Sequence, residues 1–242
     1  MDSSTNDWSG KELIGKDFTG HNLTENDFSE ADLTEATLDG ADCTRAVFYR
    51  ARLLEAQASK TSFREADLQE ANLSHAVFEG ADFTSVDLEG ADLRSSNLTR
   101  ADLRHANMTG VYMSEATLRE ACLVEVDLKA SDLRHSDLSG ADLTAADLRY
   151  SKLQGANLSG AKLEGADLTG ADLTGAQLNQ ANLSGADLSE CVINQADFSE
   201  ARHLTCSQIE STFFGKDDTR FPSYIQLQWI SEDTFECHCS ES

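Results

Sequence analysis

The sequence is short of proline, of basic residues and of long apolar runs. Its one proline among 242 residues is Pro222. Proline has no N–H to donate, so it is excluded where the backbone N–H is hydrogen-bonded to a neighbour. Its absence from residues 1–221 is typical of a chain whose N–H groups are engaged along its length. No apolar run approaches the ~20 residues of a membrane-spanning helix. Residues 1–10 are polar and lack the basic start and apolar core of a secretory signal, so we expect neither a membrane span nor a signal peptide.

Basic residues are scarce, because 19 Lys and Arg stand against 43 Asp and Glu, for a formal net charge of −24. Such a chain repels nucleic acid and anionic membranes and favours a basic protein surface as its partner. Cysteine is also sparse, with six residues at no framework spacing. We therefore expect reduced thiols and a cytoplasmic location.

What the sequence does contain is a repeat of five residues. Every fifth position from Trp8 to Phe198 is apolar. We call these 39 positions the centres of the repeat, and 26 of them are leucine. Two residues before each centre the chain has a small residue, alanine at 25 of the 34 positions from Ala31 to Ala196. A period of five fits neither a strand nor a helix. It indicates one elongated solenoid with a narrow interior filled by one large and one small side chain per unit.

The units Ala141-Asp142-Leu143-Thr144-Ala145 and Ala166-Asp167-Leu168-Thr169-Gly170 resemble those of the pentapeptide-repeat family. The resemblance covers most of the chain. It implies an all-β fold, a right-handed quadrilateral parallel β-helix in which four pentapeptides make one coil of 20 residues. About nine to ten coils at ~4.8 Å each would give a rod about 45 Å long. Residues n and n ± 20 should then touch.

The positions of four basic residues support a coil of 20 residues, because each has an acidic residue 20 positions away in the sequence. They are Arg45 between Glu25 and Glu65, Arg50 between Glu30 and Glu70, Lys152 between Asp132 and Asp172, and Arg52 beside Asp32. We interpret them as relieving repulsion between like charges. The basic run 45–52 is interpreted in the same way, rather than as a nucleic-acid patch.

The interior shows a similar compensation around its two undersized centres, Cys43 and Ala58. Four large centres stand close to them in the repeat: Phe48, Phe63, Phe78 and Phe83. We expect these phenylalanines to cluster and to fill the space that the small centres leave, as close packing requires.

One side of the coil stands out by its aspartates. The positions just before its centres are Asp7, Asp27, Val47, Asp67, Asp87, Asn107, Asp127, Asp147, Asp167 and Asp187. We call this row the acidic face. Either Asp is favoured there by hydrogen bonds to its own backbone, or the row presents regularly spaced negative charge to a partner. The predicted partner-binding residues are Asp67, Asp87, Asp127, Asp147, Asp167 and Asp187.

The repeat ends differently at its two ends. Residues 1–200 are assigned to the β-helix, with a polar first coil, and residues 201–242 to a C-terminal segment that holds six of the 17 aromatic residues. We expect this segment either to cap the last coil or to form a homodimer contact. The residues assigned to that role are Phe213, Phe214, Phe221, Tyr224 and Trp229. The run Thr219-Arg220-Phe221-Pro222 resembles the closing segment of bacterial members of the family.

Few residues of the sequence are candidates for catalysis or metal binding. Cys237-His238-Cys239, with His203 and Cys206 nearby in sequence, is the one cluster of metal-ligand type, but its spacing matches no known zinc finger. A filled solenoid has no pocket to exclude water or shift a pKa. We therefore expect no catalytic, cofactor-binding or metal-binding residues and no enzymatic activity.

The function expected from these features is a non-enzymatic interaction module that offers an acidic rod to a basic protein. Some pentapeptide-repeat proteins, the quinolone-resistance and mycobacterial ones, resemble duplex DNA and bind type II topoisomerases. The resemblance thus implies gyrase as a partner, in antibiotic or toxin resistance. This chain lacks the projecting loops and the break in the repeat that are frequent in the quinolone-resistance group. The alternative is a structural or scaffolding protein with an unrelated protein partner.

Overall fold

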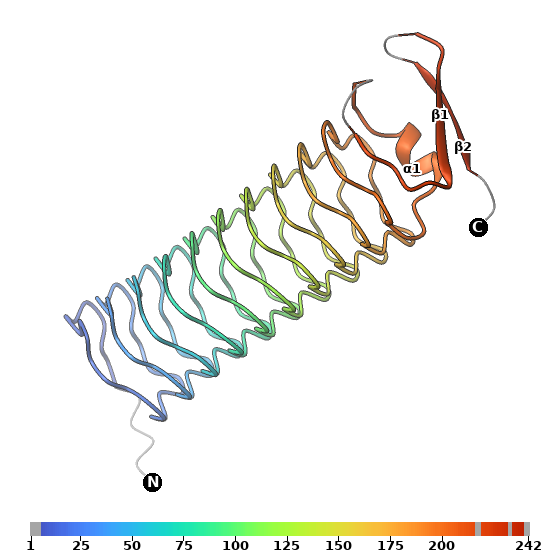
Figure 1. Ribbon diagram of the computed structural model, residues 1–242. Coiled ribbons are helices and arrows are strands. Elements are labelled where there is room, and N and C mark those ends of the chain that lie inside the picture. The colour runs from blue at the N-terminus through green and yellow to red at the C-terminus, as the bar shows by residue number, and fades with distance from the viewer. Residues whose placement is uncertain (1–5, 216–218, 232–233, 240–242) are drawn as a thin grey trace.

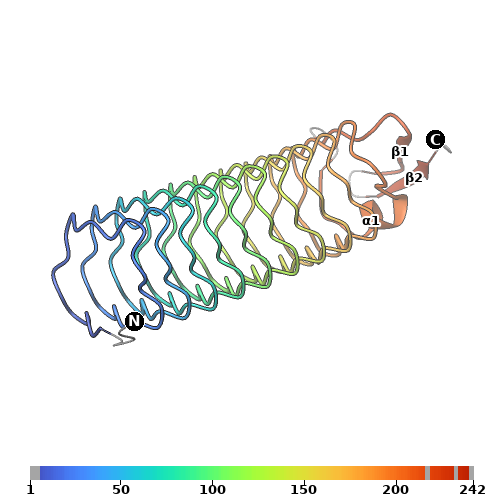
Figure 2. The same ribbon diagram turned by 90° about the horizontal axis from the view of Figure 1, so that it is seen from below.

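A computed structural model describes residues 6–215, 219–231 and 234–239. The chain winds into a long rod of stacked coils, with the N-terminal residues at one end and three short regular elements at the other (Figures 1 and 2). Parallel bridges join residues 20 positions apart, from Asp7 and Asp27 at the start to Asn182 and Arg202 near the end. The predicted contact between residues n and n ± 20 is confirmed.

Each five-residue unit forms one bridge and one turn. Leu128 N–H donates to the Asp147 carbonyl at 2.7 Å, and Asp147 N–H donates back to Val126 at 2.9 Å. Ser131 N–H then donates to the Leu128 carbonyl at 3.3 Å and closes a tight turn. Because a turn follows every bridge, the sides of the coil are single bridged residues rather than extended strands. This pairing occupies the backbone donors, which explains the lack of proline.

The corners of the coil have left-handed backbone. Every fifth residue from Gly10 to Glu200 has a φ near +60°, and only 14 of these 39 positions are glycine. A left-handed L-residue is strained by roughly 1–2 kcal/mol. Lateral hydrogen bonds hold the corners in place, as between Glu30 N–H and the Tyr49 carbonyl at 2.8 Å. The sequence suggested turns at this spacing, but not that glutamate would adopt this conformation.

The interior is filled as predicted. From Leu13 to Phe198 the centres are buried, and so are the small residues that precede them from Ala31 onward. The rings of Phe48 and Phe63 lie 5.7 Å apart, those of Phe63 and Phe83 4.9 Å, and those of Phe78 and Phe83 5.2 Å. The expected phenylalanine cluster is therefore confirmed.

Three of the four expected charge pairs form across neighbouring coils. Arg45 lies 2.6 Å from Glu25, Arg50 2.8 Å from Glu70, and Arg52 3.7 Å from Asp32. Lys152 forms no ion pair within the described part of the chain. These pairs are exposed, and such pairs contribute about 0–1 kcal/mol each. Their main effect is to interrupt ladders of like charge.

The coil continues past residue 200, where the sequence placed its end. Val192 bridges to Phe213 and Asp197 to Arg220, at offsets of 21 and 23 residues instead of 20. One extra residue lies between Arg202 and Phe213, where the chain forms α1 (Cys206–Glu210), and two more lie between Phe213 and Arg220. Because these insertions shift the phase, the repeat could not be followed through them in the sequence.

After the coil the chain forms an antiparallel hairpin of β1 (Ile225–Trp229) and β2 (Phe235–Cys239). The hairpin lies beside α1 at the end of the rod (Figure 1). Among the residues that the structure describes, no helix is long or apolar enough to cross a membrane.

Candidate functional site

The acidic face is a continuous row along the rod. Asp67 bridges to Asp87, and farther along Asp127, Asp147, Asp167 and Asp187 bridge in succession. Asn107 joins the two groups, because it bridges to both Asp87 and Asp127. The coil therefore brings together six aspartates that are spread over 121 residues of the sequence.

Each of the six carboxylates also has a local structural role. Its Oδ1 accepts the backbone N–H of the residue two positions later, at distances between 2.9 and 3.3 Å. Asn107 accepts the Thr109 N–H in the same way at 3.2 Å. Aspartates on the other sides do so too, as Asp42 does for Thr44 at 3.0 Å. Aspartate is thus favoured here by its backbone hydrogen bond, and an asparagine can replace it without loss of that bond.

Basic side chains neutralise the middle of the acidic face. Lys129 Nζ lies 2.8 Å from Asp127 and 3.2 Å from Asp147. Arg149 lies 2.7 Å from Asp147 and 3.5 Å from Asp167. This compensation was not evident from the sequence, because these two basic residues follow their centres and reach across to the aspartates before them.

Three of the six predicted residues keep an unpaired charge. Among the described residues, Asp67, Asp87 and Asp187 take part in no ion pair. Asp87 accepts hydrogen bonds from the neutral side chains of Gln69 and Asn107 instead. The structure therefore divides the acidic face into a neutralised middle and charged flanks.

Acid should destabilise the rod, because hydrogen bonds hold several carboxyl groups in their charged form. Those from the Ser189 side chain and backbone lower the pKa of Asp187. Partial burial raises the pKa of Asp147, but hydrogen bonds from Arg149 and Lys129 outweigh it, so this pKa is lowered too. A folded-state pKa below the unfolded value of about 3.9 gives stability that is present above that pH and lost as the pH falls.

We expect the urea midpoint of unfolding to be lower near pH 3 than near pH 7, by the linkage between pKa and stability. Circular dichroism at each pH would measure it. A midpoint that rises in acid would contradict this prediction, because relief of repulsion among the acids would then outweigh the lost hydrogen bonds. Repeating the series in high salt, which screens repulsion, serves as the control.

The aromatic residues of the C-terminal segment lie in two settings. Phe221 stacks on Phe198, the last regular centre, with ring centroids 6.0 Å apart. Phe214 lies 5.4 Å from Phe221 and 5.8 Å from Trp229. Phe235, which the sequence analysis did not assign, lies 5.1 Å from Phe214.

Two further assigned residues behave differently. The Tyr224 hydroxyl donates to the Ala201 carbonyl at 2.9 Å and accepts the Leu204 N–H at 3.2 Å. Phe213 occupies an outward bridge position and is 61% exposed. Phe221 and Tyr224 therefore contact the last coil, whereas Phe213 faces solvent.

A cavity of about 950 Å³ lies where the chain leaves the coil. Its walls include residues 199–205, residues 221–224 and Cys239. The expectation that a filled solenoid has no pocket did not extend to this junction, where residues beyond the regular repeat form part of the walls.

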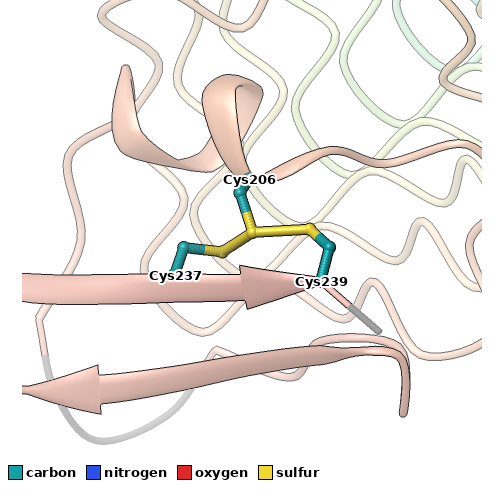
Figure 3. Close-up of side chains that lie close together, drawn as sticks. All are labelled: Cys206, Cys237 and Cys239. Atoms are coloured by element: carbon teal, nitrogen blue, oxygen red, sulfur yellow. A yellow bond between two sulfur atoms is a disulfide. The ribbon is translucent and has the colours of Figure 1, made fainter. Parts of the chain in front are cut away.

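Three cysteines meet beside this cavity. Figure 3 shows the sulfur of Cys206, at the start of α1, between those of Cys237 and Cys239 on β2 and in close contact with both. Cys43, Cys122 and Cys191 are free thiols. The sequence led us to expect reduced thiols, but not that three of the six cysteines would meet. Sequence separations of 31 and 33 residues hid this approach, which depends on the hairpin folding back onto α1.

His238 does not belong to the cysteine cluster. Its Nε2 lies 3.8 Å from Glu236, on the exposed face of β2. Side chains alternate between the two faces of a strand, so Cys237 and Cys239 share one face and His238 takes the other. The Cys-His-Cys run thus supplies two sulfurs, and Cys206 supplies the third.

The repeat matches known protein families over most of its length. Residues 12–38, 27–64, 61–100 and 166–202 match the family described as pentapeptide repeats, in 8 copies. Residues 81–158 match the one described as pentapeptide repeat region. No curated protein matches the chain.

The chain is also similar to solved structures of pentapeptide-repeat proteins. HetL, a pentapeptide repeat protein involved in heterocyst differentiation regulation from the cyanobacterium Nostoc sp. strain PCC 7120, is 33% identical. That likeness covers 82% of this chain and 85% of HetL, with a TM-score of 0.36. A trypsin-treated variant of QnrB1, a plasmid-mediated fluoroquinolone resistance protein, is 17% identical. It covers 78% of this chain and 90% of QnrB1, with a TM-score of 0.57.

A third structure is more limited in extent. Rfr23, a pentapeptide repeat protein from the cyanobacterium Cyanothece 51142, is 30% identical over 48% of this chain and 63% of its own, with a TM-score of 0.36. Members of the family matched by the repeat are right-handed quadrilateral β-helices. The repeat, the bridges at 20-residue spacing and the family matches over most of residues 12–202 together show that this chain belongs to the pentapeptide-repeat family.

Proposed function

We propose that this protein is an interaction module whose acidic rod binds a basic protein surface as a mimic of duplex DNA. Pentapeptide-repeat proteins are generally structural or interaction modules rather than enzymes. The partner we propose is a type II topoisomerase such as gyrase, in resistance to an antibiotic or toxin. A partner of this kind would place the protein in the cytoplasm.

The charge density of the rod is the observation that carries this proposal. Residues 6–202 hold 35 acidic and 17 basic side chains, a net charge of −18. At ~4.8 Å per coil of 20 residues these residues span roughly 47 Å. The rod thus carries about one net negative charge per 2.6 Å, against one per ~1.7 Å for duplex DNA. A groove that binds DNA would meet a comparable field along this rod.

The likeness to QnrB1 supports the proposal at the level of fold, since QnrB1 is a fluoroquinolone resistance protein at 17% identity. Within the acidic face, we assign the contact to the flanks, where Asp67, Asp87 and Asp187 lack basic partners among the described residues. A carboxylate already paired with Lys129 or Arg149 has less to offer a basic partner, because a new pairing must first displace the existing one.

Replacing these three aspartates by asparagine should weaken the partner complex and leave the fold intact. Asparagine keeps the acceptor for the backbone N–H, as Asn107 does, and removes the charge. We expect the triple variant D67N/D87N/D187N to lose its effect on DNA supercoiling by gyrase, with an unchanged circular dichroism spectrum.

The matched control is the triple variant D17N/D42N/D172N. These aspartates lie on other sides of the coil, make the same backbone hydrogen bond and have no ion pair among the described residues. Both variants lose three charges, so equal effects on gyrase would contradict the assignment to the acidic face. Wild-type protein without any effect on gyrase at micromolar concentration would refute the topoisomerase proposal.

A second candidate function is a structural or regulatory role with an unrelated protein partner. The identity to HetL favours it, because 33% identity over 82% of the chain is about twice that to QnrB1. HetL is described as involved in the regulation of heterocyst differentiation. Affinity capture from a host lysate separates the two candidates, since the first predicts a topoisomerase subunit among the bound proteins.

We further propose that residues 201–242 cap the rod. An uncapped coil would leave the N–H and C=O groups of its last bridges open to pairing with another molecule. The side chain of Gln208 donates to the Leu183 and Ala186 carbonyls at 2.9 and 2.8 Å, which supports this role. The alternative is a homodimer contact, for which the exposed Phe213 is the available surface.

A further inference from the structure

The three cysteines at the C-terminal end are more than one disulfide can use. Cys206 contacts both Cys237 and Cys239, but a divalent sulfur forms a single disulfide bond. One of the three thiols is therefore always left over if the cluster is oxidised. All three sulfur atoms lie within 4.8 Å of one another. Three thiolates around a zinc ion, at ~2.3 Å each, would lie about 3.8 Å apart in a tetrahedral site.

The surrounding elements aim the three sulfurs at one point. Cys237 and Cys239 stand two residues apart on β2, so both side chains leave the same face of the strand. Cys206 opposes them from the first residue of α1. The Thr205 N–H donates to the Gln208 side chain at 2.8 Å, and Gln208 in turn binds the coil. These hydrogen bonds tie the start of α1 to the rod, and Cys206 faces the two cysteines of β2 from there (Figure 3).

We propose that Cys206, Cys237 and Cys239 form a zinc site that fastens the C-terminal hairpin to the rod. Three thiols lose their protons to solvent as the ion binds, and the three thiolates supply three of the four tetrahedral ligands. The fourth position is open to water or to a group from a partner, since Cys239 is exposed and forms part of the cavity wall. His238, on the other face of β2, is not a ligand.

The small size of this segment gives the ion a structural role. β1 and β2 have five residues each, and an isolated two-stranded hairpin is marginally stable at best. A metal that joins β2 to α1 adds a link to the aromatic contacts that Trp229 and Phe235 make with Phe214. The proposal is independent of the partner of the acidic face.

Metal content tests the site directly. We expect the full-length protein, purified under reducing, chelator-free conditions, to contain close to one zinc per chain by elemental analysis. Removing even a residue that only hydrogen-bonds to a metal ligand lowers metal affinity about 10–100-fold. Loss of a direct ligand in C237S should therefore reduce retained zinc by more than roughly tenfold. The controls H238A, beside the ligands in sequence, and C122S, on a distant coil, should keep the ion. Cobalt added to the apoprotein should give a thiolate-to-cobalt charge-transfer band that C237S lacks.

Three results would overturn the proposal. One is reduced wild-type protein that neither contains zinc nor takes up zinc or cobalt on anaerobic addition. The second is an intact mass showing a disulfide in protein kept reduced throughout. The bridges of the rod do not involve the β1–β2 hairpin, so circular dichroism of C237S distinguishes loss of the metal from loss of the fold. A fully folded C237S that binds zinc as tightly as wild type would also refute the site.

Discussion

Replacing Phe63 by alanine should lower the free energy of unfolding of the rod by about 3–5 kcal/mol. The Phe63 side chain is fully buried and its ring contacts those of Phe48, Phe78 and Phe83 at 5.7, 5.9 and 4.9 Å. Removing it leaves a cavity at the centre of the phenylalanine cluster. The nearby Cys43 and Ala58 are already the smallest centres, so they cannot fill that space.

The measurement is urea unfolding followed by circular dichroism, with Tyr150→Ala as the aromatic control. Tyr150 is 64% exposed, and a surface substitution of this kind should change stability by no more than about 0.5 kcal/mol. Cys43 precedes Phe63 by one coil, so Cys43→Leu in the Phe63→Ala background should recover part of the loss by restoring volume. Equal midpoints for the Phe63 and Tyr150 variants would show that the cluster does not support the rod.

Replacing Phe221 by serine should destabilise the C-terminal end of the rod by about 2–4 kcal/mol. Phe221 stacks on Phe198 and contacts Phe214, so its loss uncovers the last centre of the coil. If the segment is a cap, the molar mass stays the same and residues 219–239 become more sensitive to protease. Light scattering after size exclusion and limited proteolysis measure both effects.

Phe213→Ser is the matched control for that prediction. Phe213 is 61% exposed and bridges on the outside of the coil, so its replacement should leave a cap unaffected. If the segment is instead a dimer contact, Phe213→Ser dissociates a wild-type dimer into monomers of unchanged stability. That outcome, together with a neutral Phe221→Ser, would overturn the capping proposal.

The acidic face shows which features of the surface the repeat determines and which it does not. The aspartates can be placed from the repeat alone, because residues 20 apart must stack. The basic partners of these aspartates cannot be placed in the same way, since Lys129 pairs with an aspartate of its own coil and with one of the next coil. Whether a carboxylate is neutralised depends on the direction a long side chain takes, which the repeat does not specify.

The sequence by itself determined the solenoid, the buried centres, the phenylalanine cluster and the positions of Arg45, Arg50 and Arg52 against acids. All of these follow from a short period that places each residue against its neighbour one coil away. Tertiary structure alone decided what lies beyond the repeat: the coil that continues to Arg220, the aromatic contacts of Phe235, and the meeting of Cys206 with Cys237 and Cys239. The physical reason is that the C-terminal segment has no period, so its contacts are set by how α1 and the hairpin pack on the last coil.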